Sequence, residues 1–450
     1  MISLGDKLRL LETSAKTSNP IINAPFTSLV AWQPTTAYAR GVIVSNGGNA
    51  YICYTSGTSG GSGPSGTGAN GIVDGTVTWF YYGVVTETRP LTPSFVTAGS
   101  VPADLTKGYT IATATQFSFS GGVPFVILPG WYSFPAVTAS PGNAGPGNNN
   151  AVSVTFMTDA PRFAIGSAFY PIRIIVDGSY VDLSNLNPTG LVQLIDFTAV
   201  GGRKARKITI ESGFAFRFQG VYVTPADTVW AINTDDKVKV AVVGDSYTSG
   251  GNSFPIAPRT DWPSQVGHYL GWSDVWNLGA GGTGYITQTA NSPNFAGRIA
   301  DVVVANPDVV IVAGGYNDSS SPASSVQNAV TAYCSQLRAA LTPTTPIIVT
   351  GIASVKGPDA NTIATEYAIQ AGAAALNDPF IYFIPISTDS KGAWLTGTGN
   401  VTAPKGAGAG SGNADVYVSS DTVHPTQSGI NYLAFRLAVA IRDIISQADL

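Results

Sequence analysis

The residues of this chain that could act as a serine nucleophile and as its base lie far apart in the sequence. Ser246 ends the apolar part of "VKVAVVGDSYTSGGN", a stretch that begins at Val238. A serine hydroxyl is a poor nucleophile unless a base takes its proton and an acid orients that base. Of the two histidines, His268 lies in a helical pattern and is expected to pack there, whereas His424 follows Asp421 by three residues in "SSDTVHPTQSG". Asp and His at this spacing on one tight loop supply a base and its orienting carboxylate.

Hydrogen-bond donors for a developing oxyanion follow the next two apolar runs. "WNLGAGGTGY" contains Gly279, Gly281 and Gly282, and glycine lets a backbone N–H approach a substrate closely. "VIVAGGYNDSS" contains Asn317, whose side-chain amide can donate. With the backbone N–H of Ser246, three donors then lie at three strand ends.

Alternating apolar runs and helical patterns position these residues. The pattern predicts strands at 238–243, 274–278, 308–313, 346–350 and 380–386, with helices near 262–271, 295–305, 322–341, 359–376 and 427–446. This alternation is typical of a doubly wound α/β domain with a mostly parallel sheet and helices on both faces. Such sheets place their sites beyond the carboxyl ends of the strands. Gly-Asp-Ser or "GYND" alone could be a turn, and "DTVHP" alone could be the start of a helix. The ordered set at strand ends and before the last helix favours a functional constellation.

Four motifs occur in one order: Gly244-Asp245-Ser246, the glycines of "NLGAGG", Gly315-Tyr316-Asn317-Asp318 and Asp421-x-x-His424. They resemble the SGNH (GDSL-type) hydrolase family over nearly all of residues 237–450. The resemblance implies a flavodoxin-like fold and a catalytic triad of Ser246, Asp421 and His424. It implies an oxyanion hole of Ser246, Gly282 and Asn317, and neither a metal nor a cofactor.

Three further residues near these motifs carry expectations. Tyr247 stands where the family motif often has leucine, and we expect it to contact substrate. Trp394 is the one large anchor in the Gly-rich, mostly polar stretch 388–420. This stretch could border the site, where Trp394 would contact substrate, or it could be plain surface. Asp318, beside the asparagine donor, is expected to be a structural loop residue.

Two regions rich in predicted strands, and a short terminal segment, precede the hydrolase-like domain, which is expected to span 236–450. Residues 1–27 predict a short helix over 4–16 and a Pro-containing connector, and residues 28–85 predict a small β module with strands at 41–45, 50–55 and 77–82. The aromatic pattern of this module resembles small chitin-binding-type carbohydrate modules and the short repeats of bacteriophage tail and tail-spike proteins. Trp32 and Trp79 could stack on a sugar ring or form the core of the module.

Residues 86–235 carry strand patterns and almost no helical periodicity, which predicts a jelly-roll-like β-sandwich. "VDGSY", residues 176–180, predicts a tight hairpin with Asp-Gly in its turn. The basic cluster of Arg203, Lys204, Arg206 and Lys207 is expected to be a solvated strand-and-turn face.

Composition excludes several classes of partner. Charged residues are only 11% of the 450, with 51 glycines and 29 prolines, as in β-rich extracellular proteins. The formal net charge of −4 implies no basic face, so nucleic acid is not an expected partner. Cys53 and Cys334 are expected to be free thiols. The N-terminal stretch lacks the apolar core of a secretory signal, and no apolar run reaches the ~20 residues that span a bilayer, so no membrane partner is expected.

The leading hypothesis is a serine esterase that removes O-acetyl groups from a bacterial surface polysaccharide. The module resemblance implies a phage or prophage tail protein released by lysis, homotrimeric and attached to the particle through its N-terminus. One alternative is a general carboxylesterase or lipase, which would need an apolar acyl channel that the polar stretch 388–420 does not suggest. Another is a non-catalytic glycan-binding adhesin, against which the intact set of five chemical positions argues.

Overall fold

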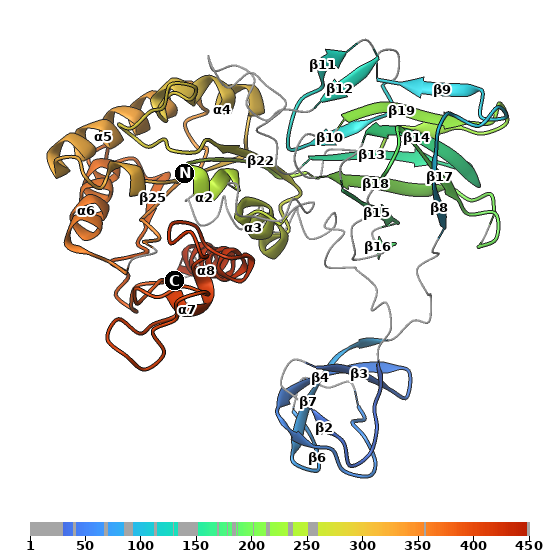
Figure 1. Cartoon of the computed structure of the whole chain (residues 1–450), viewed down its shortest axis with the longest axis horizontal. Coiled ribbons are helices and arrows are strands. Elements are labelled where there is room, and N and C mark those ends of the chain that lie inside the picture. Colours follow the sequence, from blue (N-terminus) through green and yellow to red (C-terminus); the bar gives the residue numbers. More distant parts are fainter. Residues whose placement is uncertain are drawn as a thin grey trace.

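The computed structural model describes residues 30–38, 42–66, 71–84, 93–111, 115–128, 130–133, 152–168, 171–177, 179–181, 186, 188–200, 202–212, 217–232, 237–250, 260–354 and 357–447. Its helices and strands fall into three groups along the chain, at 30–84, 94–230 and 239–447 (Figure 1). The helix expected over 4–16 lies outside the described residues.

The first group is a small β module. Its main sheet has the strand order β1-β3-β4-β7-β6, and β2 pairs with β5. The strands are β1 (Val30–Ala31), β2 (Ala37–Tyr38), β3 (Ile43–Asn46), β4 (Asn49–Thr55), β5 (Gly57–Thr58), β6 (Ile72–Asp74) and β7 (Val77–Val84). Three of them cover the three strands that the sequence predicts here.

Trp79 forms the core of this module. Its side chain is 0% exposed, and its ring meets the ring of Tyr38 edge to face with centroids 5.0 Å apart. The buried Asp74 carboxylate accepts the indole N–H of Trp79 at 3.3 Å and that of Trp32 at 2.9 Å. The interpretation of Trp79 as a sugar platform is therefore wrong, because the module itself covers its ring. Trp32 is half-buried, and a sugar contact there stays a prediction.

The second group forms two antiparallel sheets. One has the order β10-β13-β18-β15-β16 with β20 paired to β13, and the other β11-β12-β19-β14-β17-β8 with β9 paired to β19. The strands are β8 (Ser94–Ala98), β9 (Lys107–Thr110), β10 (Ser118–Ser120), β11 (Phe125–Leu128), β12 (Trp131–Ser133), β13 (Val152–Thr158), β14 (Arg162–Ala168), β15 (Ile172–Val176), β16 (Ser179–Tyr180), β17 (Val192–Asp196), β18 (Arg206–Ser212), β19 (Arg217–Val223) and β20 (Val229–Trp230).

A shared apolar core joins these two sheets. Phe156 of β13 meets Phe163 of β14 edge to face with ring centroids 6.0 Å apart, so side chains from both sheets interdigitate. Strands β15 and β16 form the expected hairpin, with Asp177 in its turn at φ 50°. The basic cluster departs from expectation at Arg206, which is 0% exposed and lies 4.3 Å from the ring centroid of Phe197.

The third group is the α/β domain that the sequence predicts. Its strands are β21 (Lys239–Gly244), β22 (Asp274–Gly279), β23 (Val309–Ala313), β24 (Ile347–Thr350) and β25 (Ile381–Ile384). Its helices are α2 (Ser246–Ser249), α3 (Trp262–Leu270), η1 (Ala296–Arg298), α4 (Ile299–Ala305), η2 (Tyr316–Asp318), α5 (Ala323–Ala340), α6 (Ala360–Ala374), α7 (Ala414–Tyr417) and α8 (Gln427–Gln447). All strand pairs are parallel in the order β22-β21-β23-β24-β25, which is the flavodoxin-like order.

Helices cover both faces of this sheet (Figure 1). Val240 and Val242 of β21 join the core that contains α3 and α8. Ala241 and Val243, which point to the opposite face, join the core that contains α4, α5 and α6. The continuous apolar run of β21 therefore fills two cores, as in a sheet buried on both faces.

The second and third groups touch at the amino end of β22. Asp274 accepts the backbone N–H of Gly121 at 2.8 Å. The ammonium of Lys237 donates to the hydroxyls of Ser118 and Ser120 on β10, at 2.8 and 2.7 Å. These contacts attach the β domain to the hydrolase-like domain at the amino end of β22. The carboxyl ends of the strands lie at the other edge of the sheet.

Candidate active site

Ser246 is the first residue of α2, directly beyond the carboxyl end of β21, and it is partly exposed. The carboxylate of Asp245 caps this helix by accepting the N–H of Tyr247 at 2.9 Å. Gly244 permits the sharp turn, because a Cβ there would lie 1.9 Å from Thr248 Oγ1. The strand therefore ends in a tight turn that presents the serine between β22 and β23, where the strand order reverses.

The loop after β22 passes beside this serine. The N–H groups of Gly279 and Ala280 donate inside the fold, to Asn277 Oδ1 at 3.0 Å and Gly244 O at 2.9 Å. A Cβ built on the next residue, Gly281, would lie 3.7 Å from Ser246 Cβ. Backbone donors toward a substrate must then come from Gly281 or from Gly282, which has a φ of 72° that favours glycine.

The loop after β23 is fastened to the same place. Asn317 Nδ2 donates to the carbonyl of Thr283 at 2.9 Å, which leaves its second N–H for another acceptor. The buried carboxylate of Asp318 accepts the N–H groups of Tyr285, Ile286 and Thr287 at 2.7, 3.2 and 2.9 Å. Asp318 is thus the structural loop residue that the sequence predicts, and it holds the glycine loop against the asparagine donor.

His424 and Asp421 pair on the loop before α8. His424 Nδ1 lies 2.7 Å from Asp421 Oδ2, and Asp421 Oδ1 accepts the backbone N–H groups of Val423 and His424, each at 2.9 Å. Burial opposes ionisation of this carboxyl, but hydrogen bonds from Ser419 Oγ, His424 and Val423 lower the pKa of Asp421. The carboxylate stays charged and pairs with Nδ1, so Nε2 is the ring nitrogen that can act as a base.

The two halves of the site meet at Tyr247. Its ring lies edge to face against the imidazole of His424, with centroids 5.7 Å apart. Since Tyr247 follows Ser246 on α2, this contact places the loop that carries His424 against the helix that begins at Ser246. The carboxyl end of one sheet therefore carries Ser246, Asn317, the 281–282 loop and the Asp421–His424 pair.

We expect Asn317→Ala to lower kcat on a nitrophenyl ester by about 100-fold or more, because an oxyanion donor acts mainly in the transition state. KM should change much less. Steady-state kinetics on the purified variants measure both, with Asn291→Ala, an exposed asparagine of the neighbouring loop, as a control within threefold of wild type. An equal loss of kcat in Asn317→Ala and Asn291→Ala would contradict the role of Asn317 as an oxyanion donor.

Asp245 makes stability depend on pH. Burial raises the pKa of Asp245 to about 6, with the Tyr247 N–H and the charge of Arg298 opposing the shift. An acid whose pKa is higher in the folded state binds its proton more tightly there, so stability falls as pH rises from about 4 to 6. The shift corresponds to roughly 3 kcal/mol.

We expect Asp245→Asn to remove this fall in stability with rising pH. The asparagine keeps a side-chain oxygen that can accept the N–H of Tyr247 at the helix cap. Urea unfolding of both proteins at pH 4 and pH 7 measures it, and the difference between the two proteins isolates this one carboxyl. If the variant loses stability between these pH values as wild type does, the assignment fails.

Sequence reasoning missed two buried residues that hold the strand ends. The guanidinium of Arg298 donates to Leu278 O, to Gly244 O at 3.0 Å and to Thr283 Oγ1 at 3.0 Å. Burial lowers the pKa of Arg298 only to about 10, so it stays charged. The carboxylate of Glu366 accepts N–H groups of residues 352 and 386–388. An isolated Arg or Glu in a helical pattern carries no sequence signal for such a role.

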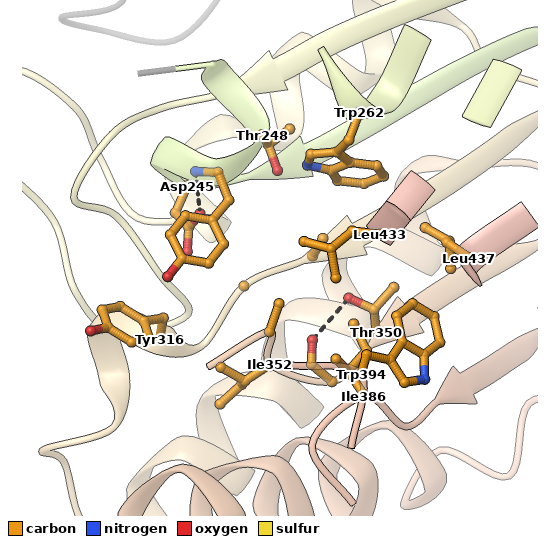
Figure 2. A pocket seen from close by; sticks show the side chains of 15 residues that line it. Asp245, Thr248, Trp262, Tyr316, Thr350, Ile352, Ile386, Trp394, Leu433 and Leu437 are labelled. Carbon is orange, nitrogen blue, oxygen red and sulfur yellow. Dashed lines mark hydrogen bonds between the residues drawn. The ribbon is translucent and has the colours of Figure 1, made fainter. Parts of the chain in front are cut away.

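The expected substrate residues Tyr247 and Trp394 are both buried, at 9% and 2% exposure. They line an apolar pocket beside α2 that also includes Trp262 and Leu433 (Figure 2). The indole N–H of Trp394 donates to Asp389 Oδ2 at 2.8 Å. Trp394 thus faces the pocket rather than the surface. The polar stretch 388–420 gave no indication of this apolar pocket, which lies beside α2.

Two features are absent from the described part of the chain. Its helices include none long and apolar enough to cross a membrane. Its His, Cys, Asp and Glu side chains form no group of three or more that could hold a metal ion. Cys53 and Cys334 are both buried free thiols.

Comparison with a family model agrees with this geometry. Residues 242–430 match the GDSL-like lipase/acylhydrolase family. That range contains Ser246, Gly282, Asn317, Asp421 and His424. No match to a curated protein was found.

Two solved structures share the fold over more than this domain. One is a family two carbohydrate esterase from Cellvibrio japonicus, 15% identical, with a TM-score of 0.54 over 76% of this chain and 98% of that one. The other is the salicylyl-acyltransferase SsfX3 from a tetracycline biosynthetic pathway, also 15% identical, with a TM-score of 0.53 over 76% of this chain and 99% of that one. The matched 76% of this chain is longer than residues 237–450, so the shared fold extends into the preceding β domain.

Proposed function

We propose that the SGNH hydrolase domain formed by residues 237–447 is a serine esterase that removes acetyl groups from a carbohydrate, namely a bacterial surface polysaccharide. The observation that carries the proposal is the Asp421–His424 pair, joined at Nδ1 over 2.7 Å and packed through Tyr247 against the helix that begins at Ser246. A base with its orienting acid beside a strand-end serine is the arrangement that activates a hydroxyl for attack.

The reaction follows from the positions of these groups. His424 Nε2 takes the proton of Ser246 Oγ, which attacks the ester carbonyl carbon. The N–H groups of Ser246 and Gly282 and the side-chain amide of Asn317 stabilise the oxyanion. Asp421 stabilises the imidazolium, which then protonates the sugar oxygen as its bond to the carbonyl carbon breaks, and the sugar leaves with a free hydroxyl. Water, activated by the same imidazole, hydrolyses the acyl-enzyme and releases acetate.

Two features support carbohydrate as the substrate class. The β domain and the hydrolase domain together share their fold with the Cellvibrio japonicus carbohydrate esterase. The small module at 30–84 resembles chitin-binding-type carbohydrate modules. We also propose, from the resemblance of that module to phage tail repeats, a tail-associated homotrimer attached through residues 1–27. Light scattering tests the oligomeric state directly.

Acetate release from a panel of O-acetylated bacterial polysaccharides tests the function. Wild type should release acetate from at least one polysaccharide, and Ser246→Ala should release none. Release by both proteins, or turnover of simple esters with no release from any polysaccharide, would contradict the proposal. The second outcome would favour a general carboxylesterase.

A further inference from the structure

The apolar pocket beside α2 has no task in the reaction proposed above. It has a volume of about 60 Å³. Figure 2 shows Asp245 and Tyr316 at one end of the space and Trp394 and Leu437 at the other, with Ile352 and Leu433 between them. Its surface is almost wholly apolar, so it suits a hydrocarbon group rather than a sugar.

Tyr247 lies between this pocket and the catalytic base. The Tyr247 side chain lines the pocket, and its ring also contacts the imidazole of His424 at 5.7 Å between centroids. On another side it meets Tyr316, also at 5.7 Å. Neither Ser246 nor His424 is among the described residues that line the pocket. The ring of Tyr247 therefore separates the reacting atoms from the apolar space.

Removal of this ring would join the two spaces. The pocket and the volume of the ring would then form one cavity whose mouth adjoins Ser246. Engineered apolar cavities of roughly 150 Å³ stay dry and bind benzene, so such a space accepts small hydrocarbon groups. The hydrocarbon group that this site generates is the acyl chain bonded to Ser246.

We propose that Tyr247 sets the acyl specificity, by closing an apolar acyl pocket and so limiting the acyl group to acetyl. This inference rests on the proposed function and adds its acyl selectivity. Each methylene that enters apolar surroundings favours the complex by about fourfold. A smaller side chain at this position should therefore favour longer acyl chains in proportion to the methylenes that the opened pocket accepts.

The test compares nitrophenyl acetate, butyrate and hexanoate in wild type and in Tyr247→Ala, Tyr247→Leu and Tyr247→Phe. The ratio of kcat/KM for hexanoate to that for acetate is taken within each protein, so a loss of active enzyme cancels. We expect this ratio to rise at least 10-fold in Tyr247→Ala and by a smaller factor in Tyr247→Leu. Leucine is the residue that the family motif often has here, so this variant keeps the test open if alanine prevents folding.

Tyr247→Phe is the matched control. The Tyr247 hydroxyl has no hydrogen-bond partner among the described residues, so phenylalanine keeps the ring and removes no bond. Its ratio of kcat/KM for hexanoate to that for acetate should stay within twofold of wild type.

A second substitution in the Tyr247→Ala protein tests the depth of the pocket. Leu437→Phe should fill the far end of the pocket. It should therefore reduce the rise in kcat/KM relative to acetate more for hexanoate than for butyrate.

Two results would overturn the role of Tyr247. One is an unchanged ratio in folded Tyr247→Ala and Tyr247→Leu, and the other is a wild type that already prefers hexanoate. If Ser246→Ala turns over every ester as wild type does, the proposed function fails and the acyl specificity fails with it. Ser246-dependent turnover with unchanged ratios would overturn the role of Tyr247 alone.

Discussion

Ser246→Ala should lower kcat on nitrophenyl acetate by about 10⁴-fold or more, with the protein folded as wild type. The structure gives the reason, because Ser246 is the side chain that the strand-end turn presents beside the Asp421–His424 pair. In serine hydrolases with this arrangement, loss of the nucleophile removes nearly all turnover. Circular dichroism and a thermal melt of the variant establish its folding.

Ser249→Ala is the matched control for this result. Ser249 lies three residues further along the same short helix, and its hydroxyl reaches the carbonyl of Ser246 at 3.4 Å. We expect kcat within threefold of wild type. If Ser246→Ala retains more than about a tenth of the wild-type kcat, another group is the nucleophile.

Arg298→Met should cause the second-largest loss, in both stability and turnover. The substitution leaves buried acceptors on residues 244, 278 and 283 without their donor. Each such group costs about 1–3 kcal/mol, so we expect stability to fall by about 3 kcal/mol or more. The same three acceptors fix the end of β21 and the glycine loop, and misplacement of a reacting group by about 1 Å can cost 100-fold in rate.

Arg298→Lys separates the effect of Arg298 on the position of the site residues from its effect on the stability of the fold. A lysine keeps the charge but cannot span three acceptors with a planar fork. We expect it to recover part of the stability and little of kcat. Denaturant unfolding and kcat, measured where each variant is folded, give the two values.

Arg338→Met provides the matched control for Arg298. Arg338 on α5 donates to Asp378 at 2.5 Å and to the carbonyls of Thr342 and Thr345 at 3.1 and 2.9 Å. Its loss should lower stability and leave kcat of the folded protein within threefold. If Arg298→Met also kept its kcat, Arg298 would be a stability residue without influence on the site.

Local pattern predicted the hydrolase fold well, because the signal lies in short continuous runs. The apolar run ending at Gly244 fills two cores, and such a run has little alternative to a central parallel strand. The strands of this domain and its helices α3, α4, α5, α6 and α8 begin and end within a few residues of their predicted bounds, whereas the short helices α2, η2 and α7 were not predicted. The site motifs were visible for the same reason, since each is a few residues long and ends a strand or begins a helix.

Long-range packing explains what sequence patterns could not predict. Arg298 donates to the carbonyls of Leu278 and Gly244, at the ends of β22 and β21, which are 20 and 54 residues away in the sequence. Nothing in "NFAGRIA" indicates this. Arg206 belongs to a basic cluster, yet the pleat of β18 turns its side chain toward Phe197. The apolar pocket was missed because its walls come from several separate segments, whereas the prediction considered only the polar stretch 388–420.

Labelling with a fluorophosphonate, followed by mass spectrometry of the peptides, tests the central claim most directly. Such a probe forms a stable bond to a serine only where a base activates its hydroxyl. We predict one adduct per chain, on the peptide that contains Ser246, absent in Ser246→Ala and formed far more slowly in His424→Ala. A folded wild-type protein without an adduct on Ser246, or an adduct that persists in Ser246→Ala, would contradict the account.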